Sequence, residues 1–187
     1  MAVIRTFISI PLPPEIWEAA RAFIGLLRPH FAGAKWERAD KLHLTMKFLG
    51  ETDERRVPEV LGAMGAAAAV VPSFTLTVSG FGAFPTLARP RILWIGCGDA
   101  GGSLALLHRE LQDRLAPLGF EREDRAFHPH VTLARLRDEG VRPHLTSLPK
   151  NLNFDARHTP VTEIFLMKSV LQPAGSVYTV VGSSRLS

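Results

Sequence analysis

Two apolar segments that each carry the pattern His, apolar, Thr, apolar constrain this chain of 187 residues more than any other feature. The first is LHLTMKFLG, residues 42–50, and the second is FHPHVTLAR, residues 127–135. Such alternation predicts half-buried β-strands, because successive side chains of a strand point to opposite faces. Each strand therefore presents one imidazole and one hydroxyl to a surface, and two apolar side chains to a core.

The polar members of each pattern are expected to share a face, His43 with Thr45 and His130 with Thr132. A single strand His beside Thr is most often a satisfied polar pair, since Thr favours strands by propensity alone. Two copies in strongly apolar strands instead indicate a site. Imidazoles titrate near neutral pH and serve as general acid and base, while hydroxyls donate hydrogen bonds to phosphate oxygens. The set suits phosphodiester cleavage without a metal ion or cofactor.

The order of the remaining patterns predicts an α+β chain of two similar halves, each with one of the two His-x-Thr strands. Antiparallel sheets with helices packed outside them fit this order, and a weak internal duplication would explain the repeated motif. Further strands are expected at residues 3–11, 73–79 and 91–96, and between 153 and 184 around a QPAGS hairpin turn; helices are expected near 13–30, 52–70 and 101–120.

Local signals also predict how these elements begin and what joins them. Thr52 or Asp53 is expected to cap the second helix, with Pro58 in its first turn, and Ser103 to cap the third. The Gly/Pro-rich segment at 80–90 is expected to be a loop, and 136–150 an irregular basic stretch.

Composition excludes some classes of protein and permits others. Hydrophobic residues make up 46% and charged residues 21%, as expected of a globular chain with a sizeable core. The net charge of +4 permits an anionic partner, although the basic residues are scattered. With Cys97 as the only cysteine, an intrachain disulfide and a cysteine-based zinc framework are excluded, and we expect a buried, inert thiol. No segment reads as a signal peptide or a membrane span, so a cytoplasmic location is expected.

Five segments together resemble the 2H phosphoesterase superfamily, and specifically the RNA 2′,3′-cyclic phosphodiesterases, also called 2′-5′ RNA ligases. They are RTFISIPLP at 5–13, the two His-x-Thr segments, PRILWIG at 90–96 and LMKSVLQPAGSVYT at 166–179, in the order that the family has them. Met46 is a mild departure, since an aliphatic residue is commoner there. The resemblance implies one domain over residues 1–187, with two pseudo-symmetric lobes around a central cleft.

The resemblance also implies an activity and residue roles. The family hydrolyses a terminal 2′,3′-cyclic phosphate of RNA to a 2′-phosphomonoester without a metal, with 2′-5′ ligation as a weak reverse reaction. Carried over to this chain, His43 is the general acid that protonates the departing 3′ oxygen, and His130 is the general base that activates water. Thr45 and Thr132 hold the phosphate oxygens. The two motifs alone do not distinguish the acid from the base, because they are nearly symmetric.

Several other residues are weaker candidates. Arg135 is a phosphate ligand by resemblance, but strict alternation puts it opposite His130 unless a bulge intervenes. Trp36 is a candidate for base stacking, whereas core packing is expected for Phe48 and Trp94. The remaining weaker expectations are a solvated strand end for Arg91, a packed aromatic or a site residue for Tyr178, no metal pair at His128, and structural or exposed places for His30, His108, His144 and His158.

Two other functions stay open from the sequence. A related 2H enzyme acting on a small cyclic nucleotide would use the same chemistry, and would gain nothing from a longer RNA substrate. A non-catalytic RNA-binding module would show no turnover and would have no need of two His-x-Thr strands. The leading prediction is a monomeric enzyme whose partner is RNA with cyclic phosphate ends, with no membrane association.

Overall fold

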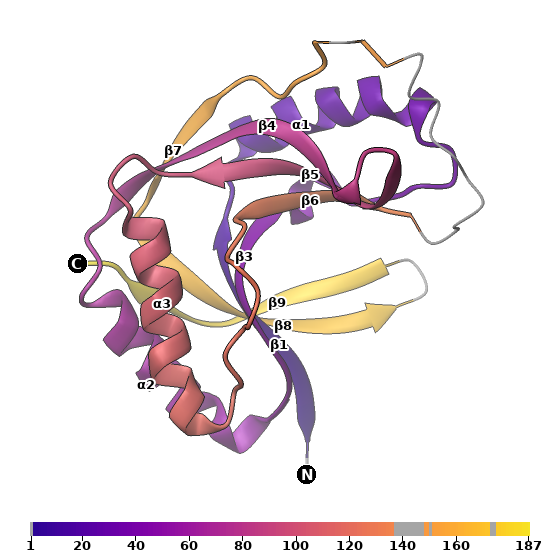
Figure 1. The fold of residues 1–187 in the computed structure, drawn as a ribbon. Coiled ribbons are helices and arrows are strands. Elements are labelled where there is room, and N and C mark those ends of the chain that lie inside the picture. Colours follow the sequence, from indigo (N-terminus) through magenta and orange to yellow (C-terminus); the bar gives the residue numbers. More distant parts are fainter. Residues whose placement is uncertain (1, 137–147, 150, 173–174) are drawn as a thin grey trace.

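A computed structural model describes residues 2–136, 148–149, 151–172 and 175–187. These residues form one antiparallel sheet with three α-helices, which confirms the predicted α+β class (Figure 1). The sheet is strongly curled, and its nine strands follow the order β7-β4-β5-β6-β3-β1-β8-β9, with β2 added beside β6. The strands are β1 Val3–Pro11, β2 Lys35–Trp36, β3 His43–Asp53, β4 Phe74–Thr86, β5 Arg89–Gly98, β6 His130–Arg135, β7 Arg157–Val161, β8 Glu163–Gln172 and β9 Gly175–Arg185.

The sheet divides into two parts that meet at the His-x-Thr strands. One part contains β1, β3, β8 and β9, and the other contains β2, β4, β5, β6 and β7. Only one residue pair, Leu44 with Val131, joins β3 to β6. The two parts of the sheet are therefore connected through the two motif strands. One domain of two pseudo-symmetric lobes stays a prediction, and this central pairing supports it.

The helices cover the sheet in a crossed arrangement. The helix α1 (Pro14–Leu27) follows β1 in the chain but lies over the other part, where the Phe23 ring meets Phe81 of β4 and Phe154 at 5.6 and 5.5 Å. Helices α2 (Val57–Ala68) and α3 (Ser103–Leu115) pack side by side on the part that contains β9 (Figure 1). The described part of the chain also contains four short 3-10 helices: Arg28–His30, Ala39–Lys41, Glu54–Arg56 and Ala116–Leu118.

The predicted loop at 80–90 is wrong, because β4 and β5 continue through it as a long hairpin. The strands pair from Thr77 with Gly98 out to Thr86 with Arg89. Gly82 serves close packing instead of a loop, since a Cβ there would lie 2.2 Å from the Trp94 ring. A glycine in a strand often marks a close approach of this kind, or a bulge. Gly82, one of the glycines that suggested a loop, is therefore the residue that admits an aromatic side chain.

The helix caps also differ in part from the prediction. Ser103 is the first residue of α3 and not its cap; the Asp99 carboxylate instead accepts the backbone N–H groups of Ser103 and Leu104 at 2.7 and 3.2 Å. Asp53 caps the 3-10 turn that precedes α2, by accepting the N–H of Arg55 at 3.0 Å.

Other boundaries follow the sequence closely. Pro58 lies in the first turn of α2, as predicted. The hairpin around QPAGS is confirmed by the β8–β9 pairing, which runs out to Gln172 with Gly175. Most of the basic stretch at 136–150, including His144, lies outside the described residues. Within the described residues, no helix is both long and apolar enough to span a membrane.

Candidate functional site

The first motif lies on β3 and has the predicted division of faces. Leu44 and Met46 are fully buried, whereas His43 and Thr45 are half-buried on the opposite face. Two irregularities in the pairing of β3 with β1 then reset the alternation. As a result Lys47 points into the core, and Phe48 turns outward with 60% of its surface exposed. The expectation of core packing for Phe48 is therefore wrong.

The second motif lies on β6 and repeats the arrangement. Val131 and Leu133 are fully buried, while His130 and Thr132 are half-buried on the other face. Neither the Thr45 nor the Thr132 hydroxyl has a hydrogen-bond partner within the described part of the chain. Both hydroxyls are thus available to a ligand.

Pairing between β3 and β6 brings the two motifs onto one surface. Leu44 lies directly across from Val131 in an antiparallel pair. One residue further in each direction, the same register sets His43 across from Thr132 and Thr45 across from His130. The four polar side chains therefore form a crossed set, in which the imidazole of each strand neighbours the hydroxyl of the other.

The backbone fixes the tautomer of both imidazoles in the same way. The Nδ1 atom of His43 lies 2.7 Å from the carbonyl oxygen of Lys41, and that of His130 lies 2.7 Å from the carbonyl oxygen of His128. A carbonyl oxygen only accepts, so each Nδ1 carries the proton and donates it. Each Nε2 is consequently the atom that is free to accept or donate a proton.

Aromatic side chains surround each histidine, and the sequence analysis did not single out two of them, Phe7 and Phe84. The His43 ring stacks on Phe7 at 4.9 Å and meets the edge of Tyr178 at 5.3 Å. The His130 ring meets Phe84 at 5.0 Å and lies 6.4 Å from Trp94. Tyr178 and Trp94 therefore line the histidine face, and Trp94 also packs over Gly82.

Burial and positive charge lower the pKa of both histidines. For His43 burial is the main cause, and the charge of Arg135 adds to it, against the opposing hydrogen bond to Lys41. For His130 burial again comes first, followed by the charges of His128 and Arg135. A lowered pKa keeps an imidazole neutral near pH 7, as a general base requires.

Arg135 reaches the histidine face because β6 contains a bulge. Leu133 is the extra residue between the cross-strand pairs Trp94 with Thr132 and Leu93 with Ala134. Arg135 consequently returns to the face of His130, as the prediction required, and its charge acts on the pKa of both histidines and of Tyr178. Its guanidinium Nε lies 4.0 Å from the Glu37 carboxylate.

Trp36 is placed elsewhere. It pairs with Ala134, which points to the core, and its ring packs against the core with Arg28 over it at 5.8 Å. The structure therefore does not bring Trp36 to the histidine face. Arg91 likewise lies on β5 between Pro90 and Ile92 and is exposed, on the face opposite Trp94.

Two of the other histidines, His108 and His158, have the structural or exposed places that the sequence indicated. The His108 ring stacks on Phe127 at 3.9 Å, and His158 lies 3.1 Å from the Thr77 hydroxyl. His128 lies 6.3 Å from His130, ring to ring. Among the described residues no three His, Cys, Asp or Glu side chains lie close enough to hold a metal ion. The Cys97 side chain is half-buried, and its loss of solvation raises the pKa of the thiol to about 12, which favours the inert thiol that the sequence predicted.

A buried lysine, Lys47, connects the first motif strand to the segment that precedes the second motif strand. Only 1% of the Lys47 surface is exposed, and its Nζ donates to Gln112 Oε1 and to the Glu121 carbonyl, both at 2.6 Å. Burial lowers the pKa of Lys47. Gln112 belongs to α3, and Glu121 begins the segment that leads to His128. Lys47 therefore links β3, α3 and this segment beneath the site.

Comparison with known families decides the relationship. A model of the 2′-5′ RNA ligase superfamily matches residues 12–172. The chain belongs to this superfamily. The RNA 2′,3′-cyclic phosphodiesterase of Thermotoga maritima is 32% identical over 176 residues, which cover 94% of this chain and 92% of that protein. The protein of the same name from Aquifex aeolicus is 29% identical, over 97% and 96%. The resemblance to the 2H phosphoesterases is thereby confirmed.

Solved structures show the same fold over the whole chain. The crystal structure of TT0787 of Thermus thermophilus superposes with a TM-score of 0.83 at 29% identity and covers 98% of each chain. The structure of Escherichia coli LigT complexed with 3′-AMP gives a TM-score of 0.75 at 29% identity, over 100% of this chain and 99% of that one. The bilobal α+β fold of this superfamily is confirmed.

Proposed function

We propose that this protein hydrolyses the 2′,3′-cyclic phosphate end of RNA to a 2′-phosphomonoester and uses no metal ion. The observation that carries the proposal is the crossed set on β3 and β6: two imidazoles, each with Nδ1 held by a backbone carbonyl, and two hydroxyls without partners in the described chain. Curated relatives that match over almost the whole chain carry the name RNA 2′,3′-cyclic phosphodiesterase, which supports the same activity.

In the proposed reaction the two histidines move protons in opposite directions. His130 Nε2 takes a proton from water, whose oxygen forms a new bond to phosphorus. The bond from phosphorus to the 3′ oxygen breaks, and His43 Nε2 donates its proton to that oxygen. The 2′ ester stays intact, so the product is a 2′-phosphate. The enzyme returns to its starting state when solvent restores the His43 proton and removes the His130 proton.

The other members of the site stabilise charge on the phosphate. The hydroxyls of Thr45 and Thr132 donate hydrogen bonds to the non-bridging oxygens, whose negative charge is concentrated in the transition state. The guanidinium of Arg135, on the same face, adds a positive charge. When the 5′-hydroxyl of a second RNA takes the place of water, its oxygen bonds to phosphorus as the bond to the 3′ oxygen breaks, and a 2′-5′ phosphodiester forms; this step would be the weak 2′-5′ ligase activity of the proposed function. The assignment of acid to His43 and base to His130 comes from the resemblance.

Phe48 gives the proposed site a stacking surface for a base. It lies across from Phe7, with 6.1 Å between the two rings, and Phe7 in turn stacks on His43. An exposed aromatic side chain beside a reactive centre suits single-stranded RNA, whose unpaired bases stack on such rings.

The test is hydrolysis of an oligonucleotide with a 2′,3′-cyclic phosphate end in excess EDTA. The wild type is expected to form a 2′-phosphate, and His43→Ala and His130→Ala each to lose about 10²–10⁴-fold in kcat/KM. His158→Ala, at an exposed strand histidine, is the matched control and should retain activity. A 3′-phosphate product, or full activity in either motif variant, would contradict the proposal. A monomeric state and a cytoplasmic location stay predictions.

A further inference from the structure

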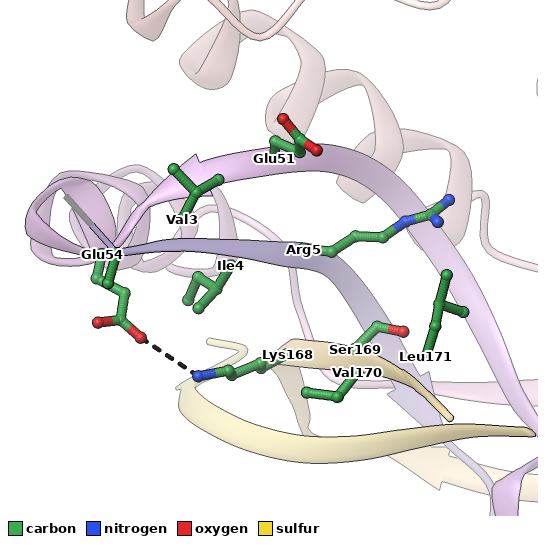
Figure 2. A pocket seen from close by; sticks show the side chains of 10 residues that line it. Val3, Ile4, Arg5, Glu51, Glu54, Lys168, Ser169, Val170 and Leu171 are labelled. Atoms are coloured by element: carbon green, nitrogen blue, oxygen red, sulfur yellow. Dashed lines mark hydrogen bonds and ion pairs between the residues drawn. The ribbon is translucent and has the colours of Figure 1, made fainter. Parts of the chain in front are cut away.

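A groove opens between β1 and β8 at the end of the lobe that holds His43. The two strands pair only from Arg5 to Ser9 of β1, so the chain before Arg5 separates from the end of β8. The resulting groove has a volume of about 550 Å³ (Figure 2). The two strands supply most of its lining, with Glu51 and Glu54 completing it. Three of its apolar residues are exposed: Val3 at 56%, Val170 at 43% and Leu171 at 70%.

Strand register makes this groove continuous with the catalytic face. Arg5 is two residues from Phe7 on β1, so both side chains share the face on which Phe7 stacks on His43. In the row across the sheet, Arg5 lies beside Ser169 of β8, which lies beside Tyr178 of β9. At about 3.4 Å per residue, Arg5 lies only ~7 Å along the strand from Phe7.

Arg5 supplies the cation of this groove that is not already paired. Lys168 is engaged by Glu54, with 3.3 Å between Nζ and Oε1. Arg5 is exposed, and its guanidinium has no hydrogen bond or ion pair with any other described residue. In Figure 2 it extends along the groove, away from the Lys168–Glu54 pair. Burial raises the pKa of Tyr178, and the positive charge of Arg5 opposes that rise, so the charge is felt at a side chain that contacts His43.

We propose that Arg5 binds a phosphodiester group of RNA upstream of the cyclic phosphate end, and that the groove between β1 and β8 receives the nucleotides attached to it. The inference rests on the function proposed above and deepens it, since it makes the enzyme selective for chains over cyclic mononucleotides. The guanidinium is a planar fork of donors that fits two phosphate oxygens. A cyclic mononucleotide has no upstream phosphate and gains nothing from Arg5.

The test compares two substrates that share one reactive end. Cytidine 2′,3′-cyclic phosphate is the short substrate, and a tetranucleotide ending in the same group is the long one. Arg5→Ala is expected to lower kcat/KM about tenfold for the tetranucleotide, and to leave it unchanged for the mononucleotide. Arg5→Lys should retain part of the activity on the tetranucleotide, because the charge remains. The matched control is Arg21→Ala, at an exposed arginine of α1.

Two further readouts separate phosphate binding from a general loss of structure. Glu51→Gln removes a negative charge across from Arg5, and should raise kcat/KM for the tetranucleotide only. The slope of log kcat/KM against log salt concentration should become shallower by about 0.7 in Arg5→Ala, as expected for one lost contact to a single-strand phosphate.

The outcomes distinguish this inference from the function on which it rests. No turnover of either substrate by the wild type would overturn the proposed function itself. Turnover of both substrates, with Arg5→Ala reducing them equally or not at all, would overturn the inference and leave the function standing. A loss confined to the tetranucleotide, with a weaker salt dependence, would support both.

Discussion

The two motif strands hold their histidines by the same backbone contact but in different surroundings. In both, Nδ1 donates to the carbonyl oxygen two residues earlier, at 2.7 Å. His43 lies between Phe7 and Tyr178, and no other histidine among the described residues stacks against it. His130 lies between Phe84 and Trp94 and has His128 as a charged neighbour.

The difference shows which properties of the site are local and which come from the fold. The tautomer depends only on backbone atoms just before each strand, so both motifs repeat it. The pKa depends on side chains from other strands: β1 and β9 around His43, and β4 and β5 around His130. A symmetric pair of motifs can thereby be given unequal proton affinities, which acid and base roles require.

The largest expected effect on activity comes from removing the threonine hydroxyl of either motif. Thr45→Val and Thr132→Val keep the side-chain shape, and each is expected to lower kcat/KM about 10²-fold, because a donor to the charged phosphate is lost. Thr77→Val on β4 is the matched control and should keep its activity. Steady-state kinetics on a cyclic-phosphate oligonucleotide measures the effect. An unchanged kcat/KM in either variant would show that the two motifs do not both bind the phosphate.

A substitution of Arg135 tests a feature that both histidines share, the influence of the Arg135 charge on their pKa values. Its charge lowers the pKa of both histidines, so Arg135→Ala should raise both. The bell-shaped pH profile of kcat/KM is set by loss of the base at low pH and of the acid at high pH. With both pKa values below 6.5, the wild-type maximum is expected below pH 6.5, and the variant's maximum at a higher pH.

Imidazole titrations by NMR give the two shifts directly. Arg91→Ala is the control, since that arginine is exposed on the opposite face of β5. Unchanged titration of either histidine in Arg135→Ala would show that Arg135 does not act on both halves.

The smallest expected effect isolates the difference between the halves. The charge of His128 lowers the pKa of His130 and not that of His43. His128→Asn should therefore raise the pKa of His130 slightly and leave the His43 titration in place. Equal pKa shifts of His43 and His130 in the same NMR titration would mean that the charge of His128 acts on both histidines alike.

Much of this site follows from strand periodicity, and the rest depends on cross-strand register. The division of His43 and Thr45 from Leu44 and Met46 needed only a period of two. Phe48 broke that period because β3 contains irregularities opposite β1, which no local pattern in the sequence signals. Its exposure on the histidine face therefore became apparent only from the fold.

Bulges and close packing explain the other differences. The bulge at Leu133 was required by the predicted role of Arg135, although the sequence did not locate it. Gly82 contributed to the predicted loop because its structural role, leaving space for the Trp94 ring, depends on a strand paired across the hairpin. Likewise, the crossing of α1 to the other half follows from the contacts of Phe23 with Phe81 and Phe154, which are remote in sequence.

The most direct measurement of the central claim, that the two motifs form one site with opposite proton roles, compares leaving groups. Bis(4-nitrophenyl) phosphate has an acidic leaving group that departs without a proton, so it needs the base but not the acid. His43→Ala is expected to lose about 10²–10⁴-fold on the cyclic-phosphate oligonucleotide and to keep most of its activity on the aryl ester, whereas His130→Ala should lose both. Equal losses of both variants on both substrates would contradict the account, and the opposite pattern would exchange the two roles.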